Sequence, residues 1–226
     1  MNSPGYRLIS FDCYGTLIDW ETGLLTALRA ALPGLGLSDD EILGDFAEME
    51  PRIQATGYKS YREVLREVLL SFANRCGKSP LSSDALADSI ASWNPFPETV
   101  HALGRLKSKY RLAILSNIDN DLFAGTAGRL VVSFDHVITA EEAGAYKPNR
   151  RNFEMLLQRT GMAPGEIIHV GESLFHDIAP AQGLGITTVW VNRSNGRTAR
   201  ASKTADTKPD VTVCDLNALA ERICPE

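Results

Sequence analysis

Short apolar segments rich in β-branched residues alternate with helical patterns along most of this 226-residue chain. The apolar segments are residues 7–11, 112–115, 134–139, 167–170 and 187–191, with a short edge strand expected at 211–213. Intervening segments 97–109, 149–160 and 179–183 carry apolar residues at the three-to-four spacing of helices. Strands that are apolar on both faces need helices on both sides. The sequence therefore predicts an α/β fold with a parallel sheet flanked by helices.

Residues 18–94 interrupt this alternation, because they contain only helical periodicity and are too long for an ordinary crossover. Helices are expected at 21–32, 38–55, 60–75 and 82–92, and Ser38 with Glu41 forms a capping-box pattern. The prolines of the segment 94–97 then end helix formation. We predict a core domain of residues 1–17 and 95–226 and an inserted helical cap domain of residues 18–94. The polar stretch 197–209 is expected to be a mobile surface loop.

Charge and composition exclude several kinds of partner. The chain has 23 basic and 28 acidic side chains, a formal net charge of -5 and no run of Lys or Arg, so we expect no nucleic-acid or membrane partner. No apolar run reaches the ~18 residues of a membrane span. The start of the chain does not resemble a signal peptide, and the four cysteines lack metal or redox spacing. We expect a cytoplasmic protein with reduced thiols, as a monomer or homodimer, acting on a small molecule.

Polar residues follow four of the predicted strands, at the sheet edge where parallel sheets bind their ligands. Each motif alone is weak, since a strand-terminal Asp or a Lys-Pro pair is often only a turn or cap. Together they supply a nucleophile, hydrogen-bond donors, a cation and an acidic pair at one crevice. The residues are Asp12 and Thr16, Ser116 and Asn117, Lys147, and Glu172 with Asp177.

The order of these motifs resembles that of the haloacid dehalogenase superfamily, in its helical-cap subclass. The resemblance implies a Rossmann-like core and a hydrolase in which Asp12 attacks the substrate and forms a covalent ester. Thr16 would hold the Asp12 carboxylate, and Ser116 and Asn117 would donate hydrogen bonds to substrate oxygens.

The same resemblance gives roles to the remaining charged residues. Lys147 would balance the carboxylates, which otherwise raise one another's pKa. Asp177 would orient Lys147, and Glu172 would position the hydrolytic water or hold a metal.

Tyr14 bears on which bond is broken. Phosphatases of the superfamily have a second aspartate two residues after the nucleophile, as general acid and base, where this chain has Tyr14. The sequence around Asp12 is similar to that of type II 2-haloacid dehalogenases. The segments 11–23, 115–119, 146–149 and 172–177 together are more closely similar to those of azetidine-2-carboxylate hydrolase. We therefore expect cofactor-independent hydrolysis of a carbon–halide or strained carbon–nitrogen bond in a small 2-substituted carboxylic acid. Tyr14 would bind substrate or pack under the cap.

Two alternatives stay open. The Gly-Glu-Ser sequence at 171–173 resembles that of Mg²⁺-dependent phosphatases, in which case Asp12, the Tyr14 carbonyl and Glu172 would hold Mg²⁺. A less favoured alternative is a non-catalytic binding member of the fold, against which the complete set of motifs argues.

The cap offers candidate substrate-binding residues. Dehalogenases of this type have a halide-binding arginine where this chain has Ala47 or Glu48, and Arg52 is a possible substitute or a solvated residue. Trp20 is expected to line the pocket or to belong to the core of the cap.

Overall fold

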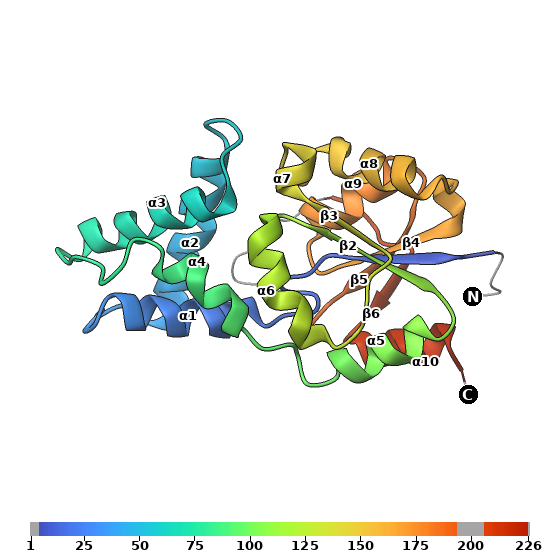
Figure 1. Cartoon of the computed structure of the whole chain (residues 1–226), viewed down its shortest axis with the longest axis horizontal. Coiled ribbons are helices and arrows are strands. Elements are labelled where there is room, and N and C mark those ends of the chain that lie inside the picture. Colours follow the sequence, from blue (N-terminus) through green and yellow to red (C-terminus); the bar gives the residue numbers. More distant parts are fainter. Residues whose placement is uncertain (1–4, 194–205, 226) are drawn as a thin grey trace.

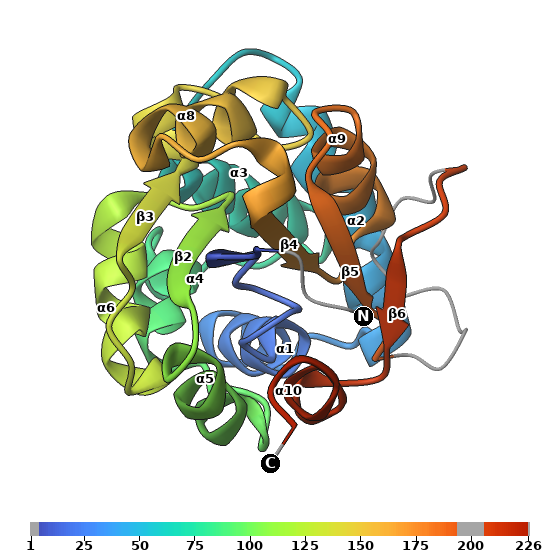
Figure 2. The same cartoon turned by 90° about the vertical axis from the view of Figure 1, so that its right-hand side faces the viewer.

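The computed structural model describes residues 5–193 and 206–225, so residues 197–205 of the predicted surface loop lie outside the described part. Six strands form one parallel sheet in the order β3-β2-β1-β4-β5-β6 (Figure 2). Their bounds are β1 Leu8–Phe11, β2 Arg111–Ser116, β3 His136–Thr139, β4 Ile167–Gly171, β5 Thr187–Val191 and β6 Val211–Val213. All six predicted strands are confirmed, with ends that shift by at most two residues.

Helices cover both faces of this sheet. On one face lie α5 (Thr99–Lys107) and α10 (Leu216–Ile223), and on the other α8 (Arg150–Thr160) and α9 (Ala179–Gln182) (Figure 2). The β2–β3 edge is flanked by α6 (Asn120–Leu130), and α7 (Ala140–Ala143) follows β3. Ile9 and Phe11 of β1 belong to one cluster of buried apolar residues and Leu8 belongs to a second, so the sheet is apolar on both faces and both need cover. The helices α6, α7 and α10 are additions to the sequence prediction.

A separate helical layer lies over the carboxyl ends of the strands (Figure 1). It consists of α1 (Trp20–Ala31), α2 (Asp39–Gln54), α3 (Tyr61–Arg75) and α4 (Ala85–Ser89), followed by a 3₁₀ turn at Ile90–Ser92. The predicted capping box is confirmed, since Ser38 Oγ accepts from Glu41 N and Glu41 Oε2 accepts from Ser38 N. The domain boundaries at 17/18 and 94/95 stay a prediction.

The predicted helix over 82–92 is corrected by the structure. It begins only at Ala85 and changes to a 3₁₀ turn at Ile90. Asp84 does not cap it, because Arg66 binds both Asp84 oxygens at 2.6 and 3.0 Å.

All four cysteines are free thiols. Within residues 5–193 and 206–225, every helix is too short or too polar to cross a membrane.

Candidate active site

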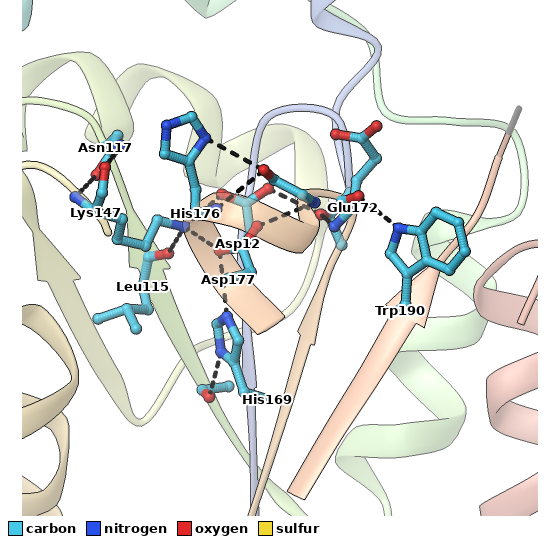
Figure 3. A network of polar contacts seen from close by, with 12 residues as sticks. Asp12, Leu115, Asn117, Lys147, His169, Glu172, His176, Asp177 and Trp190 are labelled. Atoms are coloured by element: carbon cyan, nitrogen blue, oxygen red, sulfur yellow. Dashed lines mark hydrogen bonds and ion pairs between the residues drawn. The ribbon is translucent and has the colours of Figure 1, made fainter. Parts of the chain in front are cut away.

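A buried ammonium group lies at the centre of the site (Figure 3). Lys147, in the loop between α7 and α8, donates from Nζ to Asp12 Oδ1 at 2.8 Å, Asp177 Oδ1 at 2.7 Å and Leu115 O at 2.8 Å. The side chain is only 2% exposed. All three ammonium protons therefore have an acceptor, and the cation is held in one place.

Asp12 follows the last residue of β1, at the carboxyl edge of the sheet. Its second oxygen, Oδ2, accepts from Thr16 Oγ1 at 2.8 Å, and Thr16 Oγ1 in turn accepts from Glu172 N at 2.9 Å. Gly15 has φ +97°, which an L side chain rarely adopts, and lets the chain turn back so that Thr16 faces Asp12. The carboxylate is fixed at both oxygens, as a preorganised nucleophile requires.

Asp177 lies on a π-helical turn, Leu174–Ile178, which Glu172 and Ser173 connect to β4. Gly171 makes this position possible, because a Cβ at residue 171 would lie 2.5 Å from Asp177 Cβ. Ser173 N donates to Asp177 Oδ2 at 3.3 Å, while Oδ1 receives Lys147. The wide turn thus brings the second carboxylate of the site onto the cation.

A buried pair, His169 and Ser10, adjoins Asp177, and sequence reasoning missed it. His169 Nε2 lies 3.3 Å from Asp177 Oδ1, and its Nδ1 lies 2.9 Å from Ser10 Oγ (Figure 3). Ser10 and His169 are direct partners in the β1–β4 register, and both are fully buried. A histidine inside an otherwise apolar strand was the signal that could have identified it. With Asp177 as acceptor, Nε2 carries the proton.

Burial and mutual attraction together set the charge states of the site. Burial raises the pKa of Asp12 above its ordinary value, Asp177 adds to that shift, and the Lys147 ammonium opposes it. Burial acts to raise the pKa of Asp177 too, but Lys147 and His169 outweigh it, so this pKa is lowered. Burial acts to lower the pKa of Lys147, and the two carboxylates outweigh it and raise this pKa. Lys147 and Asp177 therefore stay charged at neutral pH.

Ser116 and Asn117, at the end of β2, have different surroundings. Ser116 Oγ is buried and has no hydrogen-bond partner among the described residues. The Asn117 amide is bound to the lysine loop, since Oδ1 accepts from Lys147 N at 2.6 Å and Nδ2 donates to Lys147 O at 3.1 Å. In this structure Asn117 holds Lys147, and Ser116 is the donor available to a substrate. Direct contact of either residue with substrate stays a prediction.

A cavity of about 130 Å³ opens between these residues and the cap. Asp12, Ser116, Lys147, Glu172 and Asp177 line it from the core. The cap side includes aromatic and carboxylate side chains: Trp20, Glu21, Phe46, Glu50, Tyr61 and Trp93. The volume suits a ligand of few non-hydrogen atoms.

Tyr14 and Trp20 both line this cavity, as expected of substrate-binding residues. The Tyr14 hydroxyl shares a hydrogen bond with Thr126 Oγ1 at 2.8 Å, and its ring meets Trp93 edge-on with centroids 5.9 Å apart. Burial raises the pKa of Tyr14 well above its ordinary value, so the phenol stays protonated. It therefore provides no general base at the position where phosphatases have an aspartate.

Arg52 requires a correction, because the structure does not bring it to the cavity. Its guanidinium pairs with Glu48 on the same helix at 3.1 Å, and its side chain is 77% exposed. Of the two residues expected at the position of the missing arginine, Ala47 lines the cavity and Glu48 does not. Arg52 is thus a solvated residue of the cap, and no substrate role is assigned to it.

Glu172 and His176 complete the rim of the cavity. Glu172 reaches Gly15 with its side chain and accepts from Trp190 Nε1 at its carbonyl, at 2.7 Å. His176 shares a hydrogen bond with Ser173 Oγ at 3.3 Å. In the described part of the chain, no group of three His, Cys, Asp or Glu side chains lies close enough to hold a metal ion. A metal here would rest on the smaller set of Asp12, the Tyr14 carbonyl and Glu172.

Comparison with known proteins agrees with this geometry. A family model for haloacid dehalogenase-like hydrolases matches residues 6–185. The (S)-2-haloacid dehalogenase of Pseudomonas sp. (strain YL) is 29% identical over 225 residues, covering 94% of this chain and 92% of its own. A glyceraldehyde 3-phosphate phosphatase of Methanothermobacter thermautotrophicus is 38% identical over 129 residues, covering 56% of this chain and 57% of its own.

Among solved structures, the L-2-haloacid dehalogenase of Xanthobacter autotrophicus with chloropropionic acid covalently bound has a TM-score of 0.80. It is 22% identical, and the match covers 96% of this chain and 97% of that one. This likeness extends the agreement in fold across the cap as well as the core.

Proposed function

The chain belongs to the haloacid dehalogenase-like hydrolase family, and on that premise we propose that it hydrolyses a carbon–halide or strained carbon–nitrogen bond in a small 2-substituted carboxylic acid. Asp12 attacks the carbon that bears the leaving group, and the C–O bond of an ester forms as the bond to the leaving group breaks. Water then hydrolyses the ester, which releases a hydroxy acid and restores Asp12.

One observation carries this proposal: the Asp12 carboxylate is fixed between Lys147 and Thr16 at the floor of a small cavity. Lys147 opposes the rise in the Asp12 pKa that burial and Asp177 cause, and so favours the ionised nucleophile. Ser116 Oγ, unpartnered in the part of the chain that the structure describes, is a donor for the substrate carboxylate. Glu172, on the rim, is our candidate to position the hydrolytic water.

Hydrolysis of a phosphate ester with Mg²⁺ is the second candidate, favoured by the carboxylate of Glu172 and by the matched phosphatase. Asp12, the Tyr14 carbonyl and Glu172 would hold the ion, which would balance charge on the transferring group. Tyr14 argues against this candidate, because a buried protonated phenol bound to Thr126 replaces the acid and base that assists the leaving group. That assistance is typically worth about 10²–10⁴ in rate.

A substrate panel assayed with and without chelator tests the choice. The panel holds 2-chloropropionate, azetidine-2-carboxylate and a set of small phosphate esters. We expect turnover of a carbon-centred substrate that survives EDTA. Phosphate release that requires Mg²⁺, with no carbon-centred activity, would instead establish the second candidate. A cytoplasmic location and a monomeric or homodimeric state stay predictions from the sequence.

A further inference from the structure

The cap side of the cavity carries carboxylates, whereas a departing halide requires positive charge or hydrogen-bond donors. We call the cavity-lining residues between 20 and 93 the cap wall. Within the described residues, the cap wall carries two carboxylates, Glu21 and Glu50, and no Lys, Arg or His. A halide gains negative charge as its bond breaks, and carboxylates facing it would oppose that change. The cap wall therefore suits a cation.

Glu50 is the better placed of the two carboxylates, because its neighbours hold it. Tyr61 Oη donates to Glu50 Oε1 at 3.0 Å, and Gln54 Nε2 donates to the same oxygen at 3.1 Å. These three residues line the cavity together, from α2 and α3. Two donors on one oxygen hold the Glu50 carboxyl group in place at the cavity.

Aromatic rings make up much of the rest of the cap wall. Trp20 and Phe46 lie with ring centroids 5.4 Å apart, and Tyr61 and Trp93 line the same space. Aromatic faces beside carboxylates are a recurrent environment for organic ammonium groups, which ring faces attract. On the core side of the cavity, Ser116 Oγ is buried and has no hydrogen-bond partner among the described residues. The cap side of the cavity thus suits an ammonium group and the core side a carboxylate.

We propose that the substrate is a small zwitterion whose leaving group is a protonated amine, and that Glu50 is the residue that selects it. This inference rests on the proposed function, with Asp12 as nucleophile. Asp12 forms the new C–O bond, the C–N bond breaks, and its electron pair stays on nitrogen. In a ring substrate the freed amine remains attached to the product. Ester hydrolysis by water restores the Asp12 carboxylate and releases a proton, which the amine takes up.

Glu50 acts in this scheme on binding more than on the chemical step. Its charge attracts the ammonium of the bound substrate, and that attraction weakens as Asp12 neutralises the positive charge in the transition state. Removal of the charge should therefore raise KM for a protonated amine without lowering kcat. For a halide substrate the same change should leave kcat/KM unchanged or improve it.

The test compares Glu50→Gln with Glu48→Gln, a matched control on the same helix whose carboxylate is 71% exposed and outside the cavity lining. For azetidine-2-carboxylate we expect Glu50→Gln to raise KM by at least about tenfold, while Glu48→Gln changes nothing. An equal effect of Glu50→Gln on azetidine-2-carboxylate and 2-chloropropionate, or no effect on either, would overturn the proposal. So would a wild-type enzyme that hydrolyses 2-chloropropionate and not the ring amine, a result that keeps the proposed function.

A binding measurement keeps the inference testable if no turnover is found. In the Asp12→Asn background, calorimetry compares azetidine-2-carboxylate with cyclobutanecarboxylate, a ring of similar size without the nitrogen. We expect the amine to bind at least about tenfold more tightly and Glu50→Gln to abolish that preference. Equal binding of the two rings would contradict a cation-selecting cap wall, whatever reaction the enzyme catalyses.

Discussion

Lys147 places its ammonium nitrogen 2.8 Å from Asp12 Oδ1, in a position where the lysine side chain is 2% exposed. The same nitrogen is held by Asp177, so one cation serves two buried carboxylates. Burial disfavours the ionised form of the nucleophile, and such a cation lowers the free-energy cost of keeping that form.

Asp12→Asn should abolish turnover, with kcat reduced by at least about 10⁴, because the amide keeps the shape of the side chain and loses its nucleophilicity. Thermal unfolding should change little, since burial disfavours the charged form of Asp12 that the substitution removes. Steady-state kinetics and circular dichroism measure the two effects. A folded variant that retains turnover would exclude Asp12 as nucleophile.

Lys147→Ala should inactivate the enzyme and destabilise it by about 3–5 kcal/mol near neutral pH, because two buried carboxylates lose their counter-ion. In the variant both carboxyl groups have raised pKa values in the folded state, so proton binding favours folding. Urea unfolding should therefore show part of the lost stability returning as the pH falls. Activity within about tenfold of wild type would mean that another cation balances the site.

Activity should fall at acid pH earlier than an ordinary aspartate would cause. The pKa of Asp12 is raised from its ordinary value of 3.8, chiefly by burial, so the nucleophile is protonated while an exposed aspartate is still ionised. The acid limb of kcat/KM for 2-chloropropionate should thus lie above pH 3.8. Lys147→Met removes the cation that lowers the Asp12 pKa, so the acid limb of any residual kcat/KM should move to higher pH. An acid limb that stays at the same pH would mean that it reports the titration of another group.

His169→Asn should lower kcat with little change of KM, because His169 contacts Asp177 and lies outside the cavity lining. The lowered pKa of Asp177 means that its ionised form stabilises the fold above its unfolded pKa, and that stability is lost as pH falls through the folded value. The variant should reduce this pH-dependent stability in urea unfolding. Ser10→Ala is the control with a smaller expected effect, since it removes the partner of His169 Nδ1 and leaves the contact of His169 Nε2 with Asp177.

Much of the core site was predictable because its residues lie at or beyond the carboxyl ends of strands, and strands are recognisable from apolar runs between polar turns. Asp12 directly follows β1 and Ser116 ends β2, whereas Lys147 lies farther along, in the loop after α7. Parallel strands bring their carboxyl ends together. The contact between Ser10 and His169 depends on the β1–β4 register, which no single strand specifies.

The cap was harder to predict from the sequence, as Arg52 and Glu50 illustrate. Both lie on α2, but residues two apart on a helix point to nearly opposite sides. Phe46, Glu50 and Gln54 recur at a spacing of four and share the cavity face, whereas Arg52 lies off that face. The sequence indicates this periodicity, but only the packing of α2 against the core identifies the face that meets the cavity.

Oxygen transfer from Asp12 tests the central claim most directly. The enzyme reacts with less than one equivalent of 2-chloropropionate or azetidine-2-carboxylate in ¹⁸O-water. Mass spectrometry then measures the ¹⁸O content of the product and of the peptide that contains Asp12. A covalent ester predicts a product hydroxyl with unlabelled oxygen and one ¹⁸O atom incorporated into the Asp12 carboxylate. Label in the product hydroxyl after that single turnover, with Asp12 unlabelled, would show direct attack by water and contradict the account.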